Sequence, residues 1–145
     1  MNYDYTTNCP LYLTGVINKH LQEGLVKRLK NDGLILSSQQ VHLLLYLFEE
    51  DGISQKRLSE LTKMNKISIV KALNLLESNN YALRVQNNED QRNKNIYLTP
   101  EGKKLKEPMR ELIGKHRESV FEDTTSEEIQ IYKKVLNKML TNMTS

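Results

Sequence analysis

The chain has 145 residues, which suits one domain, and its 21 basic and 18 acidic side chains give a net charge of only +3. It contains no apolar run long enough to span a membrane, and its N-terminus lacks the basic and then apolar pattern of a secretory signal. A single cysteine excludes an intramolecular disulfide and suits a reducing compartment, so we expect a cytoplasmic protein with no membrane partner.

Two helices are predicted in the N-terminal third of the chain. The first runs from Pro10 to about Leu29 and carries apolar residues at helical spacing, namely Leu13, Val16, Ile17, Leu21, Leu25 and Leu29. The second begins at Ser37 or Ser38 and has a buried stripe of Val41, Leu44, Leu45 and Phe48. Asp51-Gly52 ends it, and Ile53 is expected to begin a short strand.

A helix–turn–helix pattern follows between residues 54 and 78. Ser54 is a natural N-cap for its first helix, and Asn65 caps the second. One face of the second helix forms a buried stripe of Ile69, Ala72, Leu73 and Leu76. The opposite face carries Lys66, Ile67, Ser68, Val70, Lys71 and Asn74.

These exposed side chains suit a helix that lies in the DNA major groove. Ile67 and Val70 are apolar on the side that faces water, and in the groove they would contact thymine methyl groups. Lys66 and Lys71 would reach phosphates or guanine, and Asn74 would read adenine. The simpler interpretation is an ordinary exposed helix, because single exposed apolar residues are common.

A β hairpin is predicted after the second helix. Apolar and polar residues alternate as in half-buried strands, Leu83 and Val85 with Arg84 and Gln86, then Ile96 and Leu98 with Asn95 and Tyr97. The polar tip between the strands carries Arg92 and Lys94, and Arg92 fits the narrow DNA minor groove. Asp90 lies two residues earlier, so it can hold the Arg92 guanidinium through a bidentate pair.

The C-terminal part is predicted to be helical. Thr99-Pro100-Glu101 begins a long helix that runs toward Phe121 and should kink at Pro108. Thr125 and Glu128 form a capping box for a last helix. Its apolar residues follow a heptad-like seam of Ile129, Tyr132, Leu136, Met139 and Met143.

The excess positive charge lies in the central segment. Residues 54–104 hold ten basic and five acidic side chains, whereas residues 1–53 have a net charge of −2 and residues 105–145 a net charge of zero. Such a distribution is typical of a surface that faces phosphates.

The chain resembles the MarR-type transcriptional regulators in several ordered motifs. These are Ser54-Gln55-x-x-Leu58, then Asn65-Lys66-x-Ser68-Ile69-Val70-Lys71, Leu76-Glu77, and Asp90-x-Arg92-x-Lys94-x-Ile96-x-Leu98-Thr99-x-x-Gly102. The Asp-x-Arg wing and the Leu-Thr-x-x-Gly exit are the specific parts. The chain departs from the pattern at Asn87-Asn88, where Asp-Pro is usual, and at Asn80, where Gly is common. Asn80 can still adopt the left-handed C-cap conformation.

The resemblance implies a mainly α protein with a small β wing, a winged helix-turn-helix. It implies one domain over residues 1–145, with a winged core at about 37–100 and dimerisation helices at about 10–31 and 101–145. It also implies a homodimer on a palindromic operator, most simply a repressor released by a small molecule. The residues expected to contact double-stranded DNA are Ser54, Lys66, Ile67, Ser68, Val70, Lys71, Asn74, Asp90, Arg92 and Lys94.

Several alternatives concern what the protein senses. A phenolic or apolar effector would use polar anchors from Tyr12, His20, His42 and Tyr46. An oxidant sensor would use Cys9, which lies near a helix N-terminus, where a thiol pKa can be lowered. A metal sensor would draw on His20, Glu23, His42 and His116, although their spacing matches no known metal motif and we predict no metal site.

Two other classes of function compete with DNA binding. The sequence has no phosphate-binding loop, no nucleophile elbow and no His-Glu-x-x-His pattern, so we expect neither an enzyme nor a cofactor. A winged helix can also serve only in protein contacts, and such a module would not bind DNA at moderate salt. The terminal helices, likewise, could pack only within one chain rather than form a dimer.

Overall fold

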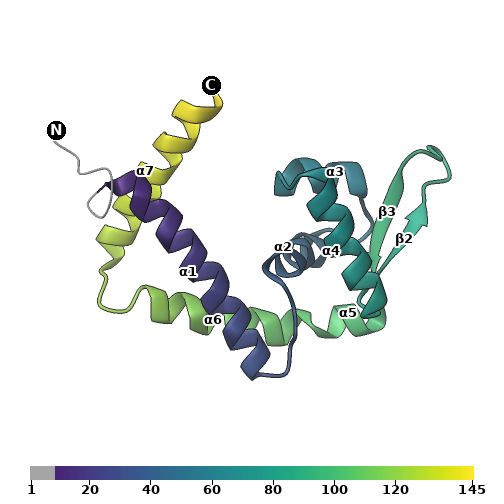
Figure 1. The fold of residues 1–145 in the computed structure, drawn as a ribbon, viewed down its shortest axis with the longest axis horizontal. Helices are drawn as coiled ribbons and strands as arrows, with labels where there is room; N and C mark the ends of the chain where they lie inside the picture. The colour runs from purple at the N-terminus through teal and green to yellow at the C-terminus, as the bar shows by residue number, and fades with distance from the viewer. Residues whose placement is uncertain (1–8) are drawn as a thin grey trace.

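The computed structural model describes residues 9–145, and these form seven helices and three short strands (Figure 1). In chain order the elements are α1 (Pro10–Asn31), α2 (Ser38–Glu49), β1 (Ile53–Ser54), α3 (Gln55–Thr62), α4 (Lys66–Ser78), β2 (Ala82–Gln86), β3 (Lys94–Leu98), α5 (Pro100–Lys104), α6 (Lys106–Val120) and α7 (Ser126–Thr144). The fold is mainly α with a small β wing, so the predicted fold class is confirmed.

The two ends of the molecule are built from different helices and strands. Figure 1 shows the helix–turn–helix and the hairpin gathered at one end, and α1, α6 and α7 at the other. α6 runs beside α1, and α5 leads back to the wing. The long C-terminal segment therefore connects the wing to the terminal helices. None of the helices described is long and apolar enough to cross a membrane.

Most helices begin at the caps that the sequence predicts. Ser37 Oγ accepts the Gln40 N–H at 3.2 Å and the Gln40 side chain accepts the Ser37 N–H at 2.9 Å, a reciprocal capping box. Thr125 and Glu128 form the same arrangement at the start of α7. Asn65 Oδ1 accepts the Ser68 N–H at 2.8 Å and starts α4. These bonds satisfy N–H groups that the helices cannot satisfy internally.

One hydrophobic core lies under the winged unit. The predicted stripe of α4 is buried, and it packs with residues from seven other elements, among them Leu29, Leu44, Leu58, Ile96 and Met109. α1 reaches this core near its C-terminal end, through the buried Leu29 and the partly buried Leu25. The rest of α1 leaves its apolar positions partly exposed.

The sheet has the order β1-β3-β2 with antiparallel neighbours. Ile96 and Leu98 are buried as predicted. The side assigned to β2 was wrong, because Leu83 and Val85 are 42% and 43% exposed and Arg84 lies opposite buried Ile96. The inner side of β2 accommodates Arg84 because the Glu77 carboxylate pairs with it there.

The long helix predicted from Thr99-Pro100-Glu101 toward Phe121 is divided into α5 and α6 at Leu105. Pro108 has no N–H, so it cannot donate to the carbonyl of Lys104, one turn earlier. The helical bonding pattern is therefore interrupted before the proline rather than at it. Leu105 keeps a helical backbone (φ −72°, ψ −20°), so α6 continues from α5 without a loop.

Candidate nucleic-acid interface

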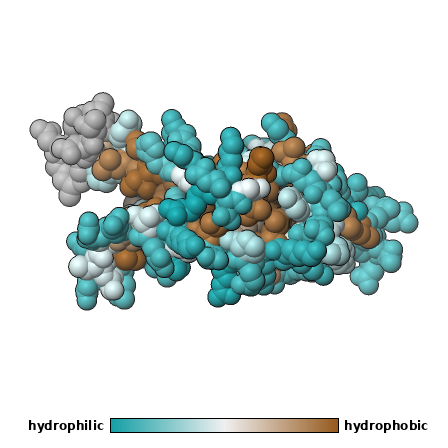
Figure 2. Space-filling model, turned by 90° about the horizontal axis from the view of Figure 1, so that it is seen from below, coloured by the Kyte–Doolittle hydropathy of each residue, from teal (hydrophilic) through white to brown (hydrophobic). Residues whose placement is uncertain are grey.

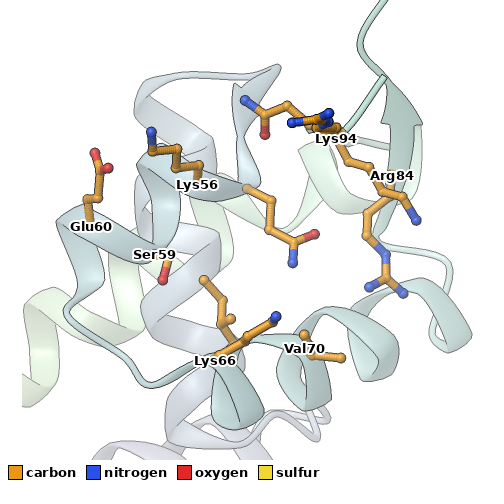
Figure 3. Close-up of a pocket in the computed structure, with 11 residues that line it drawn as sticks. Lys56, Ser59, Glu60, Lys66, Val70, Arg84 and Lys94 are labelled. Atoms are coloured by element: carbon orange, nitrogen blue, oxygen red, sulfur yellow. The ribbon is translucent and has the colours of Figure 1, made fainter. Parts of the chain in front are cut away.

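α3, α4 and the wing enclose a recess on one side of the molecule (Figure 3). We call it the cationic recess, and its lining residues are Gln55, Lys56, Ser59, Glu60, Lys66, Ile69, Val70, Arg84, Arg92, Asn93 and Lys94. Five of these side chains are cationic and one is a carboxylate, so the recess favours an anion with several charges.

α4 presents one face to solvent beside this recess. Lys66 and Val70 line the recess, as the sequence predicts. Ile67 is 81% exposed although it is apolar, and Lys71 and Asn74 are exposed on the same helix. The face therefore combines cationic, apolar and amide groups, the three kinds that the edges and phosphates of a DNA groove can use.

Two predicted contact residues lie elsewhere. Ser68 faces a cleft between α1, α2 and the start of α4 instead of the cationic recess. Its place follows from helical geometry, because it precedes the buried Ile69 and points away from the side of Val70. Ser54 uses its hydroxyl oxygen to accept the Arg57 N–H at 3.1 Å, so it caps α3.

The tip of the wing is held by short side chains. Asn87 Oδ1 accepts the Glu89 N–H at 2.9 Å, a turn that takes the place of the usual Asp-Pro. Asp90 Oδ1 accepts the backbone N–H of Arg92 at 3.0 Å. The predicted pairing of Asp90 with the guanidinium is therefore not formed, and the Arg92 side chain is exposed beside Lys94.

A network between α4 and β2 was not predicted from the sequence. Glu77 Oε1 accepts the Arg84 backbone N–H at 3.0 Å and its Nε–H at 3.1 Å, while Arg84 Nη2 lies 2.5 Å from Glu77 Oε2. Arg84 Nη2 also donates to Asn74 Oδ1 at 2.5 Å. The side-chain hydrogen bond from Arg84 lowers the pKa of Glu77, whereas burial of the carboxyl acts in the opposite direction. The sequence suggested that Asn74 is free to contact DNA. In the structure its side chain is instead hydrogen-bonded to Arg84 of β2.

The Leu-Thr-x-x-Gly exit of the wing joins β3 to the end of α4. Thr99 Oγ1 donates to the Asn80 carbonyl at 2.6 Å and accepts the Gly102 N–H at 3.0 Å. A Cβ on Gly102 would lie 1.9 Å from the Tyr81 carbonyl oxygen, so only glycine fits there. Asn80 has a φ of 59°, which confirms the predicted left-handed cap.

The four proposed effector anchors do not converge. His42 lines the cleft at the start of α4, and its ring centroid lies 5.5 Å from that of Tyr46. The Tyr46 hydroxyl donates to the Leu61 carbonyl at 3.3 Å. Tyr12 and His20 are exposed on α1 and line none of this cleft. Of the four proposed anchors, therefore, His42 alone lines this cleft, and Tyr46 lies beside the His42 ring.

The groups considered for metal and redox sensing are also separated. His20 Nδ1 lies 3.9 Å from Glu23, and His116 Nε2 lies 3.1 Å from the Leu21 carbonyl. Within residues 9–145 no three histidine, cysteine or acidic side chains gather as a metal site would require. Cys9 is half-buried at the N-cap of α1, and its thiol makes no capping bond.

Comparison with known proteins identifies the family of this chain. The family model described as transcriptional regulator SarA/Rot matches residues 13–109. The HTH-type transcriptional regulator YybA of Bacillus subtilis (strain 168) is 26% identical over 111 residues, which are 76% of this chain and 73% of that protein.

Solved structures of MarR-type regulators share the fold. A MarR protein from Peptoclostridium difficile DA00132 superposes with a TM-score of 0.85 at 26% identity, covering 99% of this chain and 92% of that one. The S. aureus MepR–DNA complex gives a TM-score of 0.83 at 25% identity, covering 92% of this chain and 98% of that one. With a family model that matches most of the chain and a MarR-like winged fold, this protein belongs to the SarA/Rot family of transcriptional regulators.

Proposed function

We propose that this regulator binds a palindromic DNA operator as a homodimer and represses transcription in the cytoplasm. The observation that carries the DNA-binding part is the cationic recess, which lies between the exposed face of α4 and the wing. α4 would enter the major groove with Lys66, Ile67, Val70 and Lys71, and Arg92 would enter the adjacent minor groove. The structure of MepR in complex with DNA supports DNA binding by this fold.

The homodimer part rests on the helices outside the winged core. In a single chain α7 has no buried residue, and Ile131, Val135 and Leu140 are exposed on it. Hydrophobic side chains are visible at the left of Figure 2, the end where α1 and α7 lie in Figure 1. An apolar groove beside them is lined mainly by hydrophobic residues of α1, α6 and α7, including Ile17, Leu21, Ile113, Val120, Phe121 and Ile129. A second copy would cover these surfaces.

The experiment that tests DNA binding is selection of duplexes from a random library by the purified protein, followed by titration of the enriched sequence. The expected result is an enriched palindrome whose half-sites are about one helical turn apart, 10–10.5 base pairs. Affinity should fall steeply with salt, because lysine and arginine contacts release counterions. A protein that enriches no sequence and binds no duplex at moderate salt would instead be a protein-interaction module.

A small-molecule effector is the second element of the proposal. The cleft of His42 lies between α1, α2 and the start of α4, and it includes Asn65, the cap of the proposed recognition helix. A phenolic or apolar compound bound there would contact α4 directly. It would weaken DNA binding only to the extent that it prefers the conformation that does not bind DNA.

The sensing alternatives are separated by one titration of the enriched operator under four conditions. Release by a phenolic compound, lost in His42→Ala, would support the effector. Release by peroxide, lost in Cys9→Ser, would support the oxidant sensor. A metal sensor would be supported if the protein bound DNA when zinc was added and failed to bind DNA after treatment with a chelator.

A further inference from the structure

Asn74 stands in the middle of the face that α4 presents to solvent, three and seven residues after Lys71 and Ile67. An asparagine at such a position ordinarily reads adenine, because its carbonyl oxygen accepts from N6 while its amide nitrogen donates to N7. To read adenine, both amide atoms must point at the same base edge. The hydrogen bond from Arg84 holds the amide oxygen away from that edge.

The orientation of the Asn74 amide is fixed by its partner. Arginine has only N–H donors, so the amide atom that faces Arg84 Nη2 must be the oxygen. Oδ1 therefore points toward β2, and Nδ2 makes no hydrogen bond with any group in residues 9–145. Asn74 presents two free N–H donors to solvent and turns its acceptor toward the protein.

Arg84 is itself held firmly enough to impose this orientation. Its guanidinium and backbone N–H make three hydrogen bonds to the Glu77 carboxylate, and its side chain is only 19% exposed. Glu77 lies on α4 one turn after Asn74, so the carboxylate and the amide approach the guanidinium from the same helix. Nη2 has two hydrogens and uses one for each of these partners.

We propose that Arg84 is a positioning residue that makes Asn74 a reader of acceptor atoms, so that it selects a G·C pair and not adenine. Guanine presents two acceptors in the major groove, N7 and O6, which match the two N–H donors of Nδ2. Adenine presents one acceptor and one donor, and its N6 donor would face no oxygen. This inference rests on the proposed DNA binding and specifies which base Asn74 reads.

The test compares the base preferences of five proteins in the same duplex selection: wild type, Asn74→Ala, Arg84→Lys, the double variant of these two, and Arg57→Lys. The base pair that Asn74 reads is the one whose preference disappears in Asn74→Ala, and in wild type it should be G·C. Arg84→Lys keeps the charge but loses the planar fork that reaches Glu77 and Asn74 together. At that pair the ratio of A·T to G·C should rise about tenfold, the size of one good base contact.

Arg57→Lys is the matched control, because Arg57 pairs with Glu50 at 3.4 Å outside the cationic recess. It should leave every preference unchanged. In the Asn74→Ala background, Arg84→Lys should produce no further change in base preference. A merely structural role of Arg84 would lower affinity for all sequences and would not change the preferred base.

Asn74→Asp provides a second test that does not disturb the strand, because residue 74 is exposed. Its carboxylate can still accept from Arg84 but has no donor, so affinity for the G·C operator should fall about tenfold. An unchanged preference in Arg84→Lys, or an adenine at the Asn74 pair in wild type, would overturn the inference while leaving DNA binding intact. Failure of wild type to bind any duplex would overturn the proposed function itself.

Discussion

At the scale of single residues, Gly102 allows the start of α5 to pack closely against the backbone at the end of α4. The Tyr81 carbonyl oxygen occupies the space where any other residue would place its Cβ, and it also accepts the Thr99 N–H at 3.0 Å. Moving this carbonyl would break that hydrogen bond and shift the end of α4. The glycine of the Leu-Thr-x-x-Gly motif therefore has a steric explanation.

We predict that Gly102→Ala lowers the free energy of unfolding by about 3 kcal/mol, the upper range for inserting a methyl group into a packed site. Gly114→Ala is the control, because a Cβ there would meet nothing within 4 Å. It should raise stability by about 0.5–1 kcal/mol, since alanine favours the helix interior. Urea unfolding followed by circular dichroism measures both. Equal stability of Gly102→Ala and wild type would contradict the steric argument.

Arg92 is the exposed arginine at the tip of the wing. We predict that Arg92→Ala weakens binding to the enriched operator by about 1–3 kcal/mol, as expected for the loss of one ordered arginine contact. Asp90→Ala should weaken binding less, because the carboxylate shapes the turn through the Arg92 N–H and does not hold the guanidinium. Gel-shift titrations at fixed salt give both values. If Arg92→Ala binds like wild type while remaining folded, the wing has no part in DNA binding.

At the scale of elements, signals confined to neighbouring residues predicted the structure well. Caps such as Asn65 and the stripe of α4 depend on residues within two helical turns, so the sequence displays them directly. The inner side of β2 depends instead on a carboxylate seven residues earlier on another element. An alternating pattern cannot reveal that partner. The predicted inner side of β2 was therefore wrong, and the hydrogen bond that holds Asn74 was not predicted.

The pairing of Glu77 with Arg84 gives the α4–β2 contact a pH dependence. The pKa of Glu77 is lowered in the folded protein from its ordinary value of 4.5, mainly by the hydrogen bond from Arg84. As pH falls below 4.5 the unfolded chain takes up this proton first, so the stabilisation is complete above that pH and is lost as pH approaches the folded pKa.

We therefore predict that Glu77→Gln is less stable than wild type by about 1 kcal/mol at neutral pH, as for a partly exposed pair. The difference should shrink as pH falls below 4.5, the ordinary pKa of this carboxyl. Glu111→Gln is the control, because its partner Lys115 lies in solvent and salt screens the pair. Urea unfolding from pH 3 to 7, about the range over which carboxylates titrate, checks this. A difference that stays constant across this range would show that Glu77 contributes by shape alone.

At the scale of the whole molecule, the winged end and the terminal helices differ in how fully they are packed. Nearly all buried apolar residues belong to the winged unit and to the parts of α1 and α6 beside it. α7 contributes none, yet its apolar residues occupy one side of the helix while its lysines and asparagines occupy the other. Such a helix is stabilised by burying its apolar side, which the single chain does only in part.

We predict that light scattering at micromolar concentration gives twice the 16.9 kDa mass of the chain. Ile131→Glu should shift the protein toward monomer, because Ile131 is 62% exposed on the apolar side of α7 and a buried charge there opposes association. Asn137→Glu, on the polar side, is the matched control and should remain dimeric. Deletion of residues 126–145 should give an aggregated or unstable protein. A soluble and well-folded monomer after that deletion would contradict the assignment of α7 to the dimer.

The incomplete burial of α7 has a consequence for gene dosage. If a second chain completes the packing of this helix, the amount of DNA-binding species follows the square of the chain concentration below the dimer dissociation constant. A twofold fall in protein level would then lower the dimer about fourfold. Proteolysis would deepen this response if it removed unpaired chains, because α7 has no buried residue in the single chain. Helix α7 would thus make DNA binding respond more than proportionally to cellular abundance, independently of any effector.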